Sequence, residues 1–108
     1  MTITQIQFLK QFSQHLVDNG FELTDNRHIV VLVKRIRLSD YETCRVEISW
    51  LPKSWPVVKV QIRIGSILIP YDVTVGLLMD YKGGPDEILA QLVREATEGL
   101  ADIIIKQL

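Results

Sequence analysis

The side chains best suited to nucleophilic catalysis or to binding a transition metal are the single cysteine, Cys44, and the two histidines, His15 and His28. A cysteine nucleophile needs a nearby base, and metal ligands recur at short, fixed spacings. Cys44 belongs to an alternation of apolar residues that ends at Trp50, which predicts a buried thiol that is hard to ionise. Neither histidine has a partner at metal-ligand spacing, and no GxSxG, HExxH or P-loop motif is present. We therefore expect no catalytic site, no metal and no cofactor, and predict that the protein is not an enzyme.

The charged residues form a second group, which is suited to binding anions. Residues 27–63 carry eight basic and three acidic side chains, a net charge of +5, whereas residues 1–26 carry −2 and residues 64–108 carry −4. Five of these basic side chains share one parity in the predicted strands, so in a sheet they lie on one face, together with two valines. The candidate partner-binding residues on this face are Val31, Val33, Arg35, Arg37, Arg45, Lys59 and Arg63.

Three interpretations of this face remain open. A patch that is partly apolar and partly basic is typical of a protein interface, here for an acidic partner. The arginines are also suited to phosphate groups, but we expect no aromatic residue on this face to stack bases, and the net charge of the whole chain is −1. Finally, long charged side chains keep a helix-free sheet face soluble without any partner.

The stretch KGGPDE, residues 82–87, places two glycines before a helix, as in loops that bind phosphate. However, Pro85 has no amide proton, and Asp86 and Glu87 already complement the positive end of the helix dipole. We therefore interpret this stretch as the start of the last helix rather than as a phosphate site. The acidic residues predicted on the solvated face of that helix are Glu87, Glu95, Glu98 and Asp102.

Two short patterns resemble known domain families. The segment LPKSWP, residues 51–56, lies between two predicted strands and resembles the proline–aromatic–proline loop of ubiquitin-conjugating and RWD-type folds. Because no cysteine follows Cys44, this resemblance implies an inactive, binding-only relative. The alternative is that Trp55 closes one end of the core. The order helix, strands, helix is also similar to that of double-stranded-RNA-binding domains, but those place lysines at the start of the last helix, where this chain has GGPDE.

The elements that must position these side chains follow from hydrophobic periodicity and turn residues. They predict one globular domain, residues 1–108, of the α+β class. We expect an antiparallel sheet of four to five strands with an N-terminal and a C-terminal helix packed on one face, in the order α-β-β-β-β-α. Residues 76–81 fit either a fifth strand or a helical turn. The predicted elements are a helix over Ile3–Asp18, strands over His28–Leu38, Glu42–Trp50, Val57–Ile64 and Ile67 to about Val75, and a helix from Pro85 to about Gln107.

Composition restricts the class of protein. Hydrophobic residues make up 47% of the chain and charged residues 23%, which is typical of a folded domain. The N-terminus lacks the pattern of a signal peptide, and the longest unbroken apolar run, Ile29–Val33, is too short to cross a membrane, so we expect a cytoplasmic protein. We predict a non-catalytic protein-binding or adaptor domain, like a chaperone, inhibitor or structural adaptor, that forms a homodimer. The alternatives are an anion- or nucleic-acid-binding domain that uses the basic face, and a small enzyme of unknown reaction.

Overall fold

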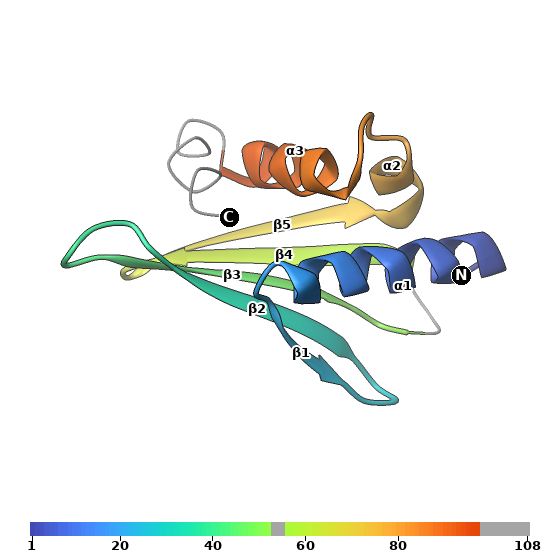
Figure 1. Cartoon of the computed structure of the whole chain (residues 1–108), viewed down its shortest axis with the longest axis horizontal. Helices are drawn as coiled ribbons and strands as arrows, with labels where there is room; N and C mark the ends of the chain where they lie inside the picture. The colour runs from blue at the N-terminus through green and yellow to red at the C-terminus, as the bar shows by residue number, and fades with distance from the viewer. Residues whose placement is uncertain (53–55, 98–108) are drawn as a thin grey trace.

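The computed structural model describes residues 1–52 and 56–97, in which five strands form one antiparallel sheet and three helices lie on one side of it (Figure 1). The predicted α+β class, with an N-terminal helix, an antiparallel sheet and a C-terminal helix, is confirmed. The elements in chain order are α1 (Ile3–Asp18), β1 (Glu22–Asp25), β2 (Val30–Arg37), β3 (Thr43–Trp50), β4 (Val57–Ile64), β5 (Ile67–Thr74), α2 (Val75–Met79) and α3 (Pro85–Thr97).

The strands follow one another across the sheet in chain order, from β1 to β5, and each is antiparallel to its neighbour. The four strands predicted from the sequence are present as β2 to β5, with the same or slightly shorter bounds. The fifth strand is β1, which was not predicted. It pairs with the first half of β2, where Glu22 stands opposite Val33. All four side chains of β1 are exposed, so it lacks the apolar alternation that identifies a strand in a sequence.

Residues 76–81, which fitted either a strand or a helical turn, mostly belong to the short helix α2. Thr74 caps this helix, because its hydroxyl oxygen accepts a hydrogen bond of 3.2 Å from the amide of Leu77. Two residues of this helix, Val75 and Leu78, are buried. The capped turn therefore carries the chain away from the edge strand β5 and towards α3.

The first helix, α1, begins and ends where the sequence predicts. Thr2 and Gln5 form a capping box, in which the hydroxyl of Thr2 accepts from the amide of Gln5 at 3.1 Å and the side chain of Gln5 accepts from the amide of Thr2 at 2.9 Å. At the other end Gly20 has a φ of 93°, the left-handed conformation that glycine supplies after a helix. The buried residues of this helix are Leu9, Phe12 and Leu16.

One hydrophobic core lies between the helices and the sheet. Alternate residues of the central strands point into it, and the side chain of Cys44 is fully buried there, as predicted. The last described helix, α3, begins at Pro85, as predicted, and packs an apolar stripe into the same core. The part of this helix predicted beyond Thr97 lies outside the described residues, as does Trp55. The buried stripe of α3 comprises Ile88, Leu89, Leu92, Val93 and Ala96.

Glu95 was predicted on the solvated face of the last helix, and this prediction was wrong. Its half-buried carboxylate accepts hydrogen bonds from the hydroxyls of Tyr81 and Tyr71, the latter at 2.7 Å, and from the side-chain amide of Gln91 at 3.1 Å. Both tyrosines reach α3 from other elements, so nothing in the local helical pattern of Glu95 reveals them. These bonds attach α3 to β5 and to the turn after α2.

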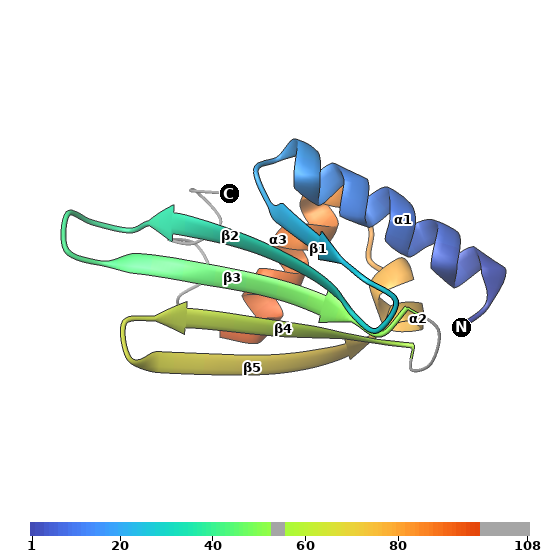
Figure 2. The same cartoon turned by 90° about the horizontal axis from the view of Figure 1, so that it is seen from below.

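The sheet face opposite the helices is covered by none of the described helices (Figure 2). We call this the outer face. On β4, for example, Val60 and Ile62 are buried in the core, and the residues that alternate with them point to the outer face. The candidate site is built on this face.

Candidate protein-binding face

All seven residues predicted to bind a partner point to the outer face. Val31, Val33, Arg35 and Arg37 alternate along β2 with buried residues. On β3, Arg45 is half-buried. The structure therefore brings the predicted residues together on one surface. Those that are exposed are Arg35, Arg37, Lys59 and Arg63.

Three of the arginines form a row across the sheet, and we call Arg35, Arg45 and Arg63 the arginine row. Arg45 on β3 stands directly opposite Arg35 on β2 and directly opposite Arg63 on β4. The three residues, with Thr43 and Gly65, line a shallow hollow of about 210 Å³. Like charges directly opposite one another on neighbouring strands destabilise a sheet, so this arrangement costs the fold some stability.

The charges of the arginine row are only partly neutralised. The guanidinium of Arg45 lies 3.0 Å from a carboxylate oxygen of Glu47, whose side chain is 20% exposed. In the described part of the chain, no carboxylate lies within ion-pair distance of Arg35 or Arg63. Within residues 1–52 and 56–97, the two outer members of the row therefore present guanidinium groups without an anionic partner.

The other half of the outer face has a different character. Val31 and Val33 are half-buried there, and Lys59 on β4 stands directly opposite Asp72 on β5, so opposite charges occupy facing positions of neighbouring strands. A hollow of about 390 Å³ lies at this end, lined in part by Ser49. The outer face is thus basic at one end and mixed apolar and polar at the other.

Sequence reasoning missed three exposed residues at the basic end. Leu68 on β5 stands directly opposite Arg63 and is 45% exposed, and its neighbour Ile67 is 59% exposed. Tyr41 is fully exposed in the turn between β2 and β3. Counting parity back from the Gly65 turn would have placed Leu68 beside the arginines. Among the described strand residues, no side chain that points to the outer face is aromatic, as expected, but Tyr41 lies at the same end as the arginine row.

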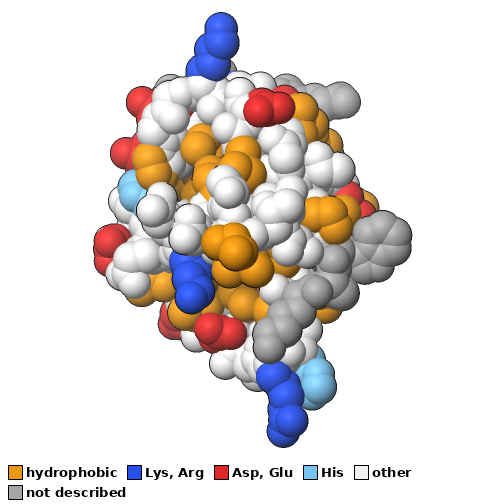
Figure 3. Space-filling model, turned by 90° about the vertical axis from the view of Figure 1, so that its right-hand side faces the viewer, with side chains coloured by type: hydrophobic (Ala, Val, Ile, Leu, Met, Phe, Trp, Pro, Cys, Tyr) orange, Lys and Arg blue, Asp and Glu red, His pale blue; other side chains and the backbone are white. Residues whose placement is uncertain are grey.

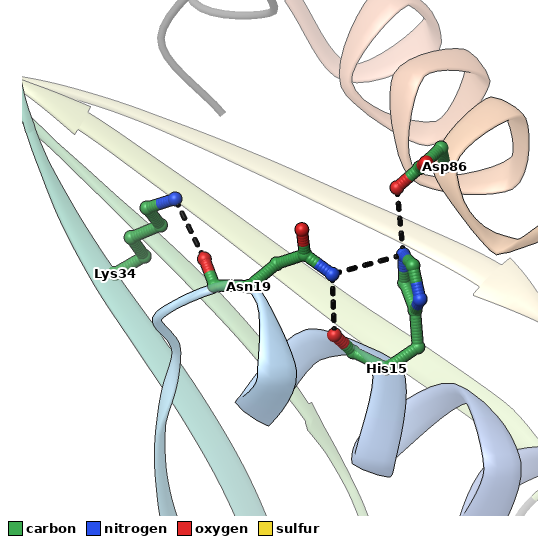
Figure 4. A network of polar contacts seen from close by, with 4 residues as sticks. All are labelled: His15, Asn19, Lys34 and Asp86. Atoms are coloured by element: carbon green, nitrogen blue, oxygen red, sulfur yellow. Dashed lines mark hydrogen bonds and ion pairs between the residues drawn. The ribbon is translucent and has the colours of Figure 1, made fainter.

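His15 and Lys34, the remaining basic residue of β2, have structural contacts on the helix side. His15 Nε2 lies 2.7 Å from a carboxylate oxygen of Asp86 at the start of α3, and it also contacts Asn19 (Figure 4). The ammonium group of Lys34 donates to the carbonyl oxygen of Asn19 at 2.7 Å. His28 is exposed in the turn between β1 and β2. These contacts join α1, β2 and α3, and they keep Lys34 away from the outer face.

A second apolar surface lies at the end of the molecule where α1 begins (Figure 3). Hydrophobic side chains gather there, and a groove of about 210 Å³ runs between α1 and the sheet. Lys10 and Asp25 also line this groove. Its apolar lining comprises Met1, Ile6, Leu9, Val17, Leu23, Val30, Trp50 and Pro52.

Comparisons of the chain with protein-family models, curated proteins and solved structures find no match. Among residues 1–52 and 56–97, no group of three histidine, cysteine, aspartate or glutamate side chains is placed to hold a metal ion. Over the same ranges, no helix combines the length and hydrophobicity needed to cross a membrane. The basis for a functional proposal is therefore the outer face and the arginine row on it.

Proposed function

We propose that this chain is a non-catalytic protein-binding domain and that its outer face docks an acidic protein. The observation that carries the proposal is the arginine row, in which Arg45 is flanked on both sides by another arginine. Repulsion between the arginines lowers the stability of the free fold. Carboxylates of an acidic partner would attract the same guanidinium groups and offset that repulsion. Arginine is also enriched in protein interfaces, because its planar guanidinium binds carboxylates through two hydrogen bonds.

The apolar neighbours of the row support a protein partner over a small anion. Leu68 and Tyr41 are exposed beside it, and Val31 and Val33 lie half-buried on the same face. Protein interfaces typically combine an apolar centre with a polar rim, and tyrosine and arginine are frequent energetic hot spots in them. An inorganic anion would leave these apolar side chains in water.

Nucleic acid is the alternative occupant, and the charge distribution favours it less. The outer face also carries three carboxylates, on Glu22, Glu47 and Asp72, which would repel a phosphate backbone. Among the residues that the structure describes, one exposed aromatic residue, Tyr41, lies in a turn at the edge of this face. Binding of single strands usually depends on several aromatic residues on which successive bases stack.

A second copy of the chain, the homodimer predicted from the sequence, would compete for the same face. Two stacked outer faces would bring together surfaces that each carry five basic and three acidic side chains, so charge favours an acidic protein instead. Edge-to-edge pairing through β5 is opposed by Pro70, which has no amide proton to donate. Sedimentation at micromolar concentration distinguishes these cases, because the proposal expects a monomer in the absence of partner.

The test of the proposed function is a charge reversal of the arginine row with a matched control. The row variant carries Arg35→Glu, Arg45→Glu and Arg63→Glu. The control carries three reversals on the helix side, where the positions are exposed. Both variants change the net charge equally, so nonspecific electrostatic effects are the same in each. The control substitutions are Lys10→Glu, Lys82→Glu and Arg94→Glu.

Wild type and both variants would be used as bait in an extract of the native host, and captured proteins would be purified and rebound one at a time. We expect to capture an acidic protein that binds the wild type and the control equally well. Its affinity for the row variant should be at least about tenfold lower. The proposal is wrong if every purified partner binds the row variant as well as it binds wild type, or if the bound material is nucleic acid. Circular dichroism of both variants excludes unfolding as the cause of a loss.

A further inference from the structure

The direction of the arginine row limits the shape of the partner segment that can cover it. Arg35, Arg45, Arg63 and Leu68 occupy one register position on four successive strands, so the line through them runs across the strands. Neighbouring strands are about 4.8 Å apart, so the backbones of Arg35 and Arg63 are separated by about 9.6 Å. Leu68 lies about 4.8 Å further along the same line.

An α-helix laid across the strands has a matching repeat. Residues seven apart on one face of a helix are separated by about 10.5 Å along the axis, close to the separation of the two outer arginines. In an extended chain, side chains on one face are separated by about 6.8 Å and then about 13.6 Å, and neither value matches. The spacing of the row therefore favours a helical segment over an extended one.

The charges indicate which helix positions must be acidic. Glu47 already pairs with the central Arg45 at 3.0 Å, so a partner gains most by placing carboxylates over Arg35 and Arg63. The exposed Leu68 then lies under a position ten or eleven residues after the first acidic one, where an apolar side chain is favoured. This is an acidic, amphipathic pattern at i, i+7 and i+10 or i+11.

We infer that the arginine row recognises an acidic α-helix of another protein that crosses the strands, with carboxylates seven residues apart over Arg35 and Arg63 and an apolar side chain over Leu68. This inference rests on the proposed function and specifies its partner. The described helices of this chain do not present the pattern themselves, because Glu87 on α3 is followed seven residues later by Arg94, and α1 has a single acidic residue, Asp18. No described helix of a second copy therefore supplies the pattern, and the excess of basic side chains on the outer face favours an acidic protein as the partner.

The experiment uses three synthetic peptides of about 20 residues, since shorter isolated helices are marginal in water. The facial helix has glutamates seven residues apart and a leucine three residues further on, in an alanine–glutamine background. The scrambled helix has the same composition with its glutamates five residues apart, on different faces. The extended peptide has the same number of glutamates in a background of alternating threonine and valine. Affinities for the whole chain are measured by fluorescence anisotropy at about 50 mM salt, where charge pairs are weakly screened.

We expect the facial helix to bind at least about fivefold more tightly than either other peptide, as two charge pairs would provide. Arg35→Gln and Arg63→Gln each remove this preference, whereas Arg94→Gln, exposed on α3 and away from the outer face, changes it less than about twofold. Equal binding of all three peptides overturns the helix inference and leaves the acidic-protein proposal in place. If no peptide binds, the helix inference is again wrong, and the charge-reversal capture decides on the proposed function separately. A single-stranded oligonucleotide that binds more tightly than every peptide overturns both.

Discussion

Arg63 on β4 stands directly opposite Arg45 on β3, and both side chains point away from the core of the protein. Four residues earlier on the same strand and the same face, Lys59 stands directly opposite Asp72. The outer face thus contains a like-charge pair and an opposite-charge pair in otherwise similar settings. This contrast allows the energetic cost of the arginine row to be measured within one strand.

We expect Arg63→Gln to stabilise the fold by about 0.5 kcal/mol at low salt, because it removes a directly opposed like charge. For a chain of this size that free energy corresponds to a rise in melting temperature of about 2–4 °C. Lys59→Gln is expected to have the opposite sign, since it removes a positive charge that stands directly opposite the carboxylate of Asp72. Thermal unfolding at low ionic strength measures both changes.

The difference in stability between Arg63→Gln and Lys59→Gln should nearly vanish in about 1 M salt, where the screening length is about 3 Å. Stabilisation by Arg63→Gln that persists unchanged in high salt would mean that its cause is packing rather than charge. A destabilised Arg63→Gln variant would show that the row does not strain the fold.

Side-chain parity could be predicted from the sequence, whereas register could not. Parity follows from the alternation along each strand, so the basic residues were correctly expected on one face of the sheet. Which arginine stands opposite which depends on the length of each turn, and the residues between Trp50 and Val57 carry no signal that fixes how β3 pairs with β4. The alignment of Arg35, Arg45 and Arg63 in one row therefore emerged only from the pairing of the strands.

The elements with local signals were predicted well, and those that depend on distant contacts were missed. The first helix carries its own caps at Thr2 and Gly20, so its bounds were correct. The edge strand β1 exposes all its side chains and exists because β2 offers it hydrogen bonds. The buried role of Glu95 likewise depends on Tyr71, which is 24 residues away in the chain.

Two glycines should respond oppositely to substitution by alanine. Gly76 lies in α2, and a Cβ atom added there would meet no atom within 4 Å. We expect Gly76→Ala to stabilise the fold by about 0.5–1 kcal/mol, since alanine restricts the unfolded chain and favours the helix. Gly83 has a φ of +99°, and an added Cβ would lie 2.7 Å from the Cβ of Glu87.

We therefore expect Gly83→Ala to lower the free energy of unfolding by about 2 kcal/mol. The left-handed backbone is unfavourable for alanine, and the contact with the Cβ atom of Glu87 cannot relax by side-chain rotation. Urea unfolding of the two variants measures both effects. If Gly83→Ala were neutral, the turn before α3 would have to adopt a different conformation in solution. The exposed Gly84→Ala variant, two residues before Asp86, is a control for the turn sequence itself.

The thiol of Cys44 should be unreactive in the folded protein. Its side chain is fully buried, and burial raises the pKa of the thiol above its usual value, so little thiolate forms at neutral pH. We expect Ellman's reagent to label Cys44 only as fast as the protein unfolds, and at once in concentrated urea. Rapid labelling of the native protein at pH 7 would contradict the burial of this residue and would reopen a catalytic role for it.

Glu95 should make the stability of the protein depend on acid pH. Hydrogen bonds from Tyr81, Tyr71 and Gln91 lower the pKa of its carboxyl group in the folded state. Its contribution to stability is therefore fully present above the unfolded pKa, about 4.3, and is lost as the pH falls through the lower, folded pKa. We expect Glu95→Gln to cost about 1–2 kcal/mol at pH 7, since two tyrosine hydroxyls lose a charged acceptor.

The cost of Glu95→Gln should shrink as the pH is lowered from 5 to about 2, because protonation then removes the same charge from the wild type.

The tyrosines provide a second window, at alkaline pH. Burial and a hydrogen bond to Glu95 raise the pKa of Tyr81, and a separate hydrogen bond to Glu95 raises that of Tyr71, so wild type should lose stability as the pH rises beyond about 10. Urea unfolding across this range, with the exposed Arg94→Gln on the same helix as control, measures the profile. If the free energy of unfolding of Glu95→Gln changed with acid pH in parallel with that of wild type, the Glu95 carboxylate would not stabilise the packing of α3 on β5.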